Sequence, residues 1–166
     1  MLFFTGAAHH SWTILKEQEK CSTSRSTAVE SLHQIRRLAD RIRTALVNGD
    51  LHGFGTLLDE GWQAKKRVSD KISNSRIDKL YQLAKDHGAI GGKITGAGGG
   101  GFLLLYCESQ NQESVRAAFR QEGIREMEFD FDFQGAHVVV NDPFIDGDER
   151  CGPRWTFIPA AKFVAD

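Results

Sequence analysis

Residues 88–107 read GAIGGKITGAGGGGFLLLYC, and this stretch decides the fold because a glycine-rich turn stands directly before an apolar strand. Eight of the 17 glycines in the 166-residue chain fall within residues 88–101. Glycine has no Cβ, so its backbone can adopt positive φ and approach another group closely. Successive backbone N–H groups in such a turn can bind the oxygens of an anion. We therefore predict a phosphate- or substrate-binding loop made of Lys93, Thr95, Gly96, Ala97, Gly98, Gly99, Gly100 and Gly101.

The loop also has a structural interpretation, in which its glycines let a tight turn pack against another part of the backbone. We favour ligand binding because five glycines within residues 96–101 exceed what a hairpin turn requires. Residues 96–101 satisfy the dinucleotide-binding pattern GxGxxG, but that pattern needs a following helix, and residues 102–107 predict a strand. No GK[ST] triplet follows the glycines, which excludes a P-loop.

The rest of the chain predicts an α+β fold, a mostly antiparallel sheet backed by helices. Strands are expected at 1–5, before the glycine turn, at 102–107 with both faces buried, at 126–133 where acidic and apolar residues alternate, and at 136–140. Helices are expected at 11–20, from residue 27 to the Asn48-Gly49 stop, from the Asp50 cap onward, at 74–87 and at 111–122. One domain would span 1–141, and residues 142–166 form an irregular tail without periodicity.

Local signals inside the helices give further predictions. Thr27 and Glu30 form a T-x-x-E capping box at the start of the first long helix. Trp12 and Trp62 fall on apolar stripes and are expected in the core. The apolar stripe of the first long helix consists of Val29, Leu32, Ile35, Leu38, Ile42 and Leu46.

Composition limits the possible partners. The formal net charge of −1 argues against a dedicated nucleic-acid binder, and no apolar run is long enough to span a membrane. The three cysteines form no CxxC pair, which favours free thiols in a reducing cytoplasm. No metal site is predicted, because the pair His9-His10 has no third ligand at suitable spacing. A solvated strand face is the expected role of Glu126, Glu128, Asp130 and Asp132.

Residues 91–107, GGKITGAGGGGFLLLYC, resemble the third signature motif of the GHMP superfamily of small-molecule kinases, which includes galactokinase and mevalonate kinase. The likeness extends to LFFTG at 2–6 and to residues 32–93, where the chain is similar to one branch, the D-glycero-D-manno-heptose 7-phosphate kinases. It covers residues 2 to about 142 and implies the ferredoxin-like C-terminal domain of these kinases.

The resemblance implies that the chain corresponds to the C-terminal half of such a kinase. In the family an N-terminal domain carries the loop that binds ATP with Mg²⁺ and the catalytic Asp and Lys, and this sequence contains no such loop. Residues 95–100 would line the acceptor site, and Thr5, Gly6 and His9 would lie on its substrate side. The catalytic residues are not assigned to this chain.

Three functional hypotheses follow. In the first, the chain contributes to ATP-dependent phosphate transfer onto the anomeric hydroxyl of a sugar phosphate and is inactive without an N-terminal half, which a second polypeptide could supply. In the second, it is a stand-alone module that binds anions or sugar phosphates without catalysis. In the third, it is a truncated product that self-associates through an exposed apolar surface.

Overall fold

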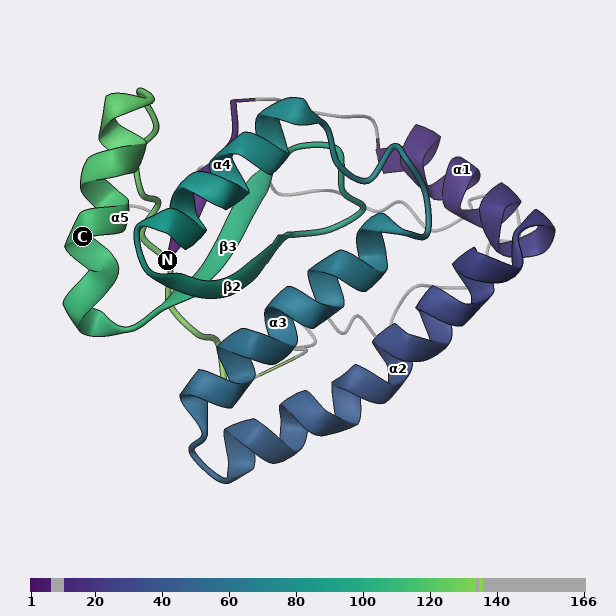
Figure 1. Ribbon diagram of the computed structural model, residues 1–166, viewed down its shortest axis with the longest axis horizontal. Coiled ribbons are helices and arrows are strands. Elements are labelled where there is room, and N and C mark those ends of the chain that lie inside the picture. The colour runs from purple at the N-terminus through teal and green to yellow at the C-terminus, as the bar shows by residue number, and fades with distance from the viewer. Residues whose placement is uncertain (7–10, 134, 136–166) are drawn as a thin grey trace, which may run out of the picture. The chain divides into compact units, whose positions relative to one another are not determined.

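The computed structural model describes residues 1–6, 11–133 and 135, and residues Met1–Asp130 form one compact unit. The predicted strand 136–140, the predicted domain boundary at 141, the predicted tail 142–166 and the substrate-side candidate His9 lie outside the described residues. The elements in chain order are β1 (Leu2–Phe4), α1 (Ser11–Ser24), α2 (Ser26–Val47), α3 (Leu51–Lys66), α4 (Ser75–Asp86), β2 (Ala89–Ile94), β3 (Phe102–Cys107) and α5 (Ser109–Gln121) (Figure 1).

The three strands form one antiparallel sheet in the order β1-β3-β2, so the strand that follows the glycine loop lies in the centre. Leu104 of β3 pairs with Leu2 of β1 on one side and with Lys93 of β2 on the other. Helices and an antiparallel sheet confirm the predicted α+β fold, with the glycine loop joining two neighbouring strands.

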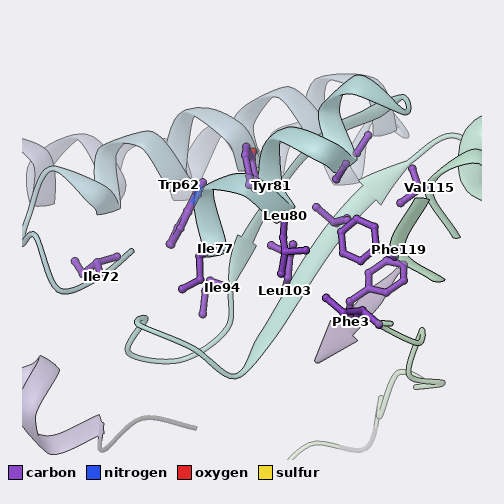
Figure 2. Close-up of a cluster of buried hydrophobic side chains, with 14 of the residues drawn as sticks. Phe3, Trp62, Ile72, Ile77, Leu80, Tyr81, Ile94, Leu103, Val115 and Phe119 are labelled. Carbon is purple, nitrogen blue, oxygen red and sulfur yellow. The ribbon is translucent and has the colours of Figure 1, made fainter. Parts of the chain in front are cut away.

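Strand β3 buries one face fully, whereas the sequence predicted burial of both faces. Its side chains alternate between a buried set and a half-buried set, respectively Leu103, Leu105, Cys107 and Phe102, Leu104, Tyr106. The buried set joins the main core with side chains of α4 and α5. There the ring of Phe119 lies 4.2 Å from the ring of Phe3, centroid to centroid (Figure 2). The prediction was wrong because the main core covers one face and the other face is covered only in part, and strand side chains alternate between faces.

Helices α2 and α3 form a hairpin whose turn is as the sequence predicted. Asn48 ends α2, and Gly49 adopts a φ of +70°. The Asp50 side chain accepts a 2.8 Å hydrogen bond from the Gly53 N–H and so caps α3. Glycine after a helix end and aspartate at a helix start satisfy backbone groups that the helices leave unpaired.

The start of α2 differs from the prediction. Its N-cap is Arg25, which makes no side-chain capping hydrogen bond, and Thr27 lies within the first turn instead of capping it. The Arg25 N–H donates to the Cys21 carbonyl of α1, so the two helices are nearly continuous and no separate capping box forms.

The apolar stripe predicted for α2 is buried only in part. Leu38 is fully buried in a small cluster with Ala45 of the same helix and Leu57 of α3. Val29, Leu32 and Leu46 are between 38% and 48% exposed. Besides Leu38, the buried residues of α2 are Ala28, Ser31 and Ala45, which are smaller than the side chains of the predicted stripe.

The two predicted core tryptophans have opposite outcomes. Trp62 of α3 is completely buried, as predicted, and its ring lies near that of Tyr81 (Figure 2). Trp12 of α1 is 68% exposed, with the Lys16 ammonium 4.6 Å above its ring. Helix α1 buries Ile14 instead. Residues two apart on a helix lie on nearly opposite sides of it, so Trp12 and Ile14 do not both face the core.

Helix α3 approaches strand β2 so closely that no side chain fits between them. A Cβ on Gly91 of β2 would lie 2.0 Å from the Gly55 carbonyl oxygen of α3. A polar network beside this contact ties the helices together, because the Tyr81 hydroxyl donates to the Asp59 carboxylate at 2.6 Å and Lys85 lies 3.6 Å from the same carboxylate.

The same network shifts two pKa values. Burial of Asp59 opposes its ionisation, but the hydrogen bonds from Tyr81 and Gln63 and the charge of Lys85 outweigh burial and hold the pKa of Asp59 below its usual value. Burial, followed by the contact with Asp59, raises the pKa of Tyr81 well above its usual value. The carboxylate is therefore stabilised in its charged form and the phenol in its neutral form.

Within the described residues, the segment 126–133 forms a bridge but not the predicted strand. Glu126 makes an isolated bridge with Phe3, and the Met127 N–H donates to the Leu2 carbonyl at 2.7 Å. The neighbouring strand predicted at 136–140 lies outside the described residues. Glu126 also pairs with Arg116 of α5 and is half-buried, so it does not belong to a solvated face as predicted.

Within residues 1–6, 11–133 and 135, no helix is long and apolar enough to cross a membrane. The same residues contain no group of three or more His, Cys, Asp or Glu side chains placed to hold a metal ion.

Candidate functional site

The glycine loop, residues 95–101, joins the end of β2 to the start of β3. Its base is closed by a 2.9 Å hydrogen bond from the Thr95 N–H to the Phe102 carbonyl. Four of its glycines have φ in the range that favours glycine, with +74° at Gly96, +113° at Gly98, +75° at Gly99 and +85° at Gly101. The backbone path of the loop therefore depends on residues without a Cβ.

The loop has an inner part and a rim. Gly98, Gly99 and Gly100 are buried, and the Gly99 N–H donates to the Ile72 carbonyl at 2.7 Å. A Cβ on Gly98 would lie 2.9 Å from the same carbonyl oxygen. The rim consists of residues that are at least partly exposed, namely Gly96, Ala97 and Gly101.

Four different elements or element ends hold the loop by its carbonyl groups. Lys65, in the last turn of α3, donates to the Gly96 carbonyl. Gln18 of α1 donates to the Ala97 carbonyl at 3.0 Å, and Asn74, the N-cap of α4, donates to the Gly99 carbonyl at 3.1 Å. At the far end of the loop, the Gly101 carbonyl accepts from both the N–H and the hydroxyl of Thr5, at 2.9 Å each.

This anchoring engages the carbonyl groups and leaves N–H groups at the rim. Among the residues that the structure describes, the N–H groups of Gly96, Ala97 and Gly101 donate to no acceptor. A loop fixed through its carbonyls, with N–H groups at its exposed edge, can offer those N–H groups to an anionic ligand.

Two lysines supply positive charge at the first residues of the loop. Burial lowers the pKa of Lys65, and the nearby ammonium of Lys93 lowers it further. In the described part of the chain, no carboxylate lies within 4.0 Å of either ammonium, whereas the neighbouring Lys66 pairs with Asp78. Two neighbouring cations without an acidic partner favour the binding of an anion.

Replacing Lys93 with glutamine is expected to raise the pKa of Lys65 toward the usual value of 10.5. The Lys93 ammonium favours the neutral form of Lys65, so its removal makes protonation of Lys65 easier. Inorganic phosphate bound beside Lys65 should raise the same pKa in the wild-type chain. NMR titration of the lysine ¹³Cε resonances measures both changes. Lys79→Gln removes one charge from an exposed site on α4 as a control, and an unchanged Lys65 pKa in Lys93→Gln would contradict this electrostatic coupling.

The predicted substrate-side residues lie at the other end of the loop. Thr5 is 1% exposed and bonds to Gly101 as described, and Gly6 follows it with a φ of +80°. The Arg76 Nε donates to the Thr5 carbonyl at 2.9 Å. The structure thus brings Thr5 and Gly6 to the last residue of the loop and adds a guanidinium beside them.

Sequence reasoning missed four side chains that meet the loop or its closing residue Thr5: Gln18, Lys65, Asn74 and Arg76. Asn74 could have been found, because an Asn before a helical apolar pattern is a typical N-cap. The other three carry no local signal, since each reaches a partner at least 31 residues away in the sequence.

Comparison with known proteins matches this chain to one sequence family and to several curated relatives. The family model described as "GHMP kinases C terminal" matches residues 42–125. The D-glycero-alpha-D-manno-heptose 7-phosphate kinase of Campylobacter jejuni is 30% identical over 135 residues, which cover 81% of this chain and 40% of that protein. A galactokinase of Streptomyces coelicolor is 32% identical over 79 residues, which cover 48% of this chain and 20% of that protein.

Solved structures show the same fold at lower identity. The mevalonate kinase of L. major in complex with R-mevalonate superposes with a TM-score of 0.67 and 19% identity, over 73% of this chain and 37% of that chain. The mevalonate kinase of Methanococcus jannaschii gives a TM-score of 0.60 and 21% identity, over 75% of this chain and 36% of that chain. The chain therefore spans about 40% or less of the length of these relatives.

Proposed function

The chain belongs to the family of GHMP kinase C-terminal domains, and from this premise we propose that its glycine loop forms the acceptor side of a sugar-phosphate kinase site. The observation that carries the proposal is the anchoring of the loop through four carbonyl groups, from Lys65, Gln18, Asn74 and Thr5. Because the carbonyl groups are engaged, the N–H groups at the rim are the ones left to bind a ligand. They lie beside two lysines that have no acidic partner in the described residues.

The reaction class that fits this arrangement is transfer of a phosphoryl group to the anomeric hydroxyl of a phosphorylated sugar. Such transfer depends mainly on positioning and on stabilising negative charge. The rim N–H groups of Gly96 and Gly101 would orient phosphate oxygens, and Lys65 with Lys93 would stabilise their charge. The phosphorylated substrate is supported by the 30% identity to the Campylobacter jejuni heptose 7-phosphate kinase.

The family implies ATP and Mg²⁺ as cofactors, and only the phosphate groups of ATP fit the described residues. Phosphate groups such as those of ATP suit the rim N–H groups and the two lysines. Mg²⁺ does not suit the described residues, which contain no cluster of metal-ligating side chains. No carboxylate or imidazole occurs within residues 95–101 that could act as a general base. We infer that this chain by itself binds phosphate but does not turn over ATP.

Titration of the ¹⁵N-glycine-labelled chain with mannose 6-phosphate tests the proposal. This probe carries a free anomeric hydroxyl and a phosphate at the far end of the sugar. The largest amide shifts are expected at Gly96 and Gly101, because their N–H groups lie at the loop rim. ADP formation from MgATP in the same sample should equal the blank. Shifts that leave the loop unaffected, or robust ATP turnover by this chain alone, would contradict the proposal.

A chimera separates the kinase half from a binding module without catalysis. In it, this chain replaces the matching part of the Campylobacter jejuni kinase, which provides the remaining part of the enzyme. We expect the chimera to phosphorylate the substrate of that kinase. A chimera that melts cooperatively and binds mannose 6-phosphate but has no turnover would favour the binding module.

A further inference from the structure

Arg76, in the first turn of α4, lies across the end of strand β1. Its Nε donates to the Thr5 carbonyl at 2.9 Å, and its Nη2 lies 3.5 Å from the place where a Cβ on Gly6 would be. Thr5 itself is buried and holds the Gly101 carbonyl through two hydrogen bonds. The guanidinium is therefore fixed by one N–H at the end of the glycine loop, with its two Nη groups remaining as further donors.

Arg76 does not stabilise α4 through its charge. The first turn of a helix carries the positive end of the helix dipole, where a positive side chain is unfavourable. Asp78, the acidic residue of that turn, pairs with Lys66 and accepts from Ser73. No carboxylate among the described residues lies within 4.0 Å of the Arg76 guanidinium.

One cationic side chain therefore meets the first residues of the glycine loop, and another meets Thr5 beside its last residue. Lys65 meets Gly96 at the beginning of the loop, and Arg76 reaches Thr5, which closes the loop at Gly101. Phosphorylation of a sugar phosphate involves two anionic groups, the incoming phosphoryl group at the neutral anomeric hydroxyl and the phosphate that the sugar already carries.

We propose that Arg76 binds the phosphate already present on the acceptor sugar and so selects phosphorylated over neutral sugars. This inference rests on the proposed function of the loop. A guanidinium presents parallel N–H donors that match two oxygens of one phosphate, which an ammonium cannot reproduce. The tether to Thr5 fixes the orientation of the fork in advance, so less side-chain freedom is lost on binding.

Binding of mannose 6-phosphate and of mannose to matched variants tests this role. The dissociation constants come from the amide shifts of the loop in the ¹⁵N-glycine-labelled full chain. Arg76→Gln should weaken binding of mannose 6-phosphate by about tenfold or more, because a charged hydrogen-bond pair is lost. Binding of mannose should stay unchanged. Arg76→Lys keeps the charge without the fork and should give an intermediate loss.

The controls separate this inference from the proposed function. Arg43→Gln removes the same charge from an exposed site on α2 and should bind both sugars as the wild type does. If Arg76→Gln binds mannose 6-phosphate like the wild type while Lys65→Gln binds it weakly, the role of Arg76 is overturned and the loop remains a phosphate site. If mannose 6-phosphate shifts no loop amide in any of these proteins, both proposals are overturned.

Discussion

Gly91→Ala is expected to lower the free energy of unfolding by about 3 kcal/mol or more, at the upper end of the cost of overpacking a core. Its Cβ would lie 2.0 Å from the Gly55 carbonyl oxygen and 2.8 Å from the Asp59 N–H nitrogen, both of them backbone atoms of α3. Backbone cannot move aside as a side-chain tip can, so α3 must separate from β2. Urea denaturation followed by circular dichroism measures the change.

Gly61→Ala is the matched control for this prediction. Gly61 belongs to the same helix, and its added Cβ would meet no atom closer than 3.9 Å. Alanine favours helix over glycine, so this variant should be more stable by about 0.5–1 kcal/mol. A Gly91→Ala chain as stable as the wild type would show that α3 and β2 are not packed backbone to backbone.

Gly98→Ala is expected to weaken binding of mannose 6-phosphate to the loop by about tenfold or more, with a cost in stability of about 1–3 kcal/mol from backbone strain. Gly98 has a φ of +113°, and its Cβ would lie 2.9 Å from the Ile72 carbonyl oxygen. The loop must therefore move away from Ile72, which displaces the rim N–H groups of Gly96 and Gly101. The amide shifts of these two glycines report both the displacement and the loss of affinity.

Gly49→Ala shows the effect of strain alone on this measurement. Gly49 also has a positive φ, +70°, but a Cβ there would meet no atom within 4 Å, and the residue lies in the turn between α2 and α3. It should lose stability and keep its affinity for mannose 6-phosphate. Equal affinities in Gly98→Ala and the wild type would mean that the packing of the inner loop does not position the rim.

The glycine cluster shows how far sequence reasoning reached. Its position between two strands was predicted correctly, since period and turn residues are local signals. Ligand contact was predicted for every residue of the loop, and for the rim residues it stays a prediction. The structure gives some of the glycines packing roles, because Gly91 faces the backbone of α3 and Gly98 faces the backbone at Ile72. Both interpretations of a glycine-rich segment thus apply, at different residues.

The local errors have a common origin in tertiary packing. Trp12 fits an apolar stripe, yet α1 turns Ile14 into the main core, and which of the two faces inward depends on where that core lies. The alternation in 126–133 predicts a strand, but in the described residues this segment makes a single bridge, from Glu126 to Phe3, and the strand predicted beside it at 136–140 lies outside them. Thr27 fits a capping box that the near-continuity of α1 and α2 makes unnecessary.

The sequence by itself determined the fold class, the family and the place of the glycine loop, because these depend on residue types at short and regular spacing. The tertiary structure alone decided which groups surround the loop. Lys65 reaches Gly96 across 31 residues, Arg76 reaches Thr5 across 71 and Gln18 reaches Ala97 across 79. Such contacts leave no periodic trace in the chain, since they form only when separate helices pack around one sheet.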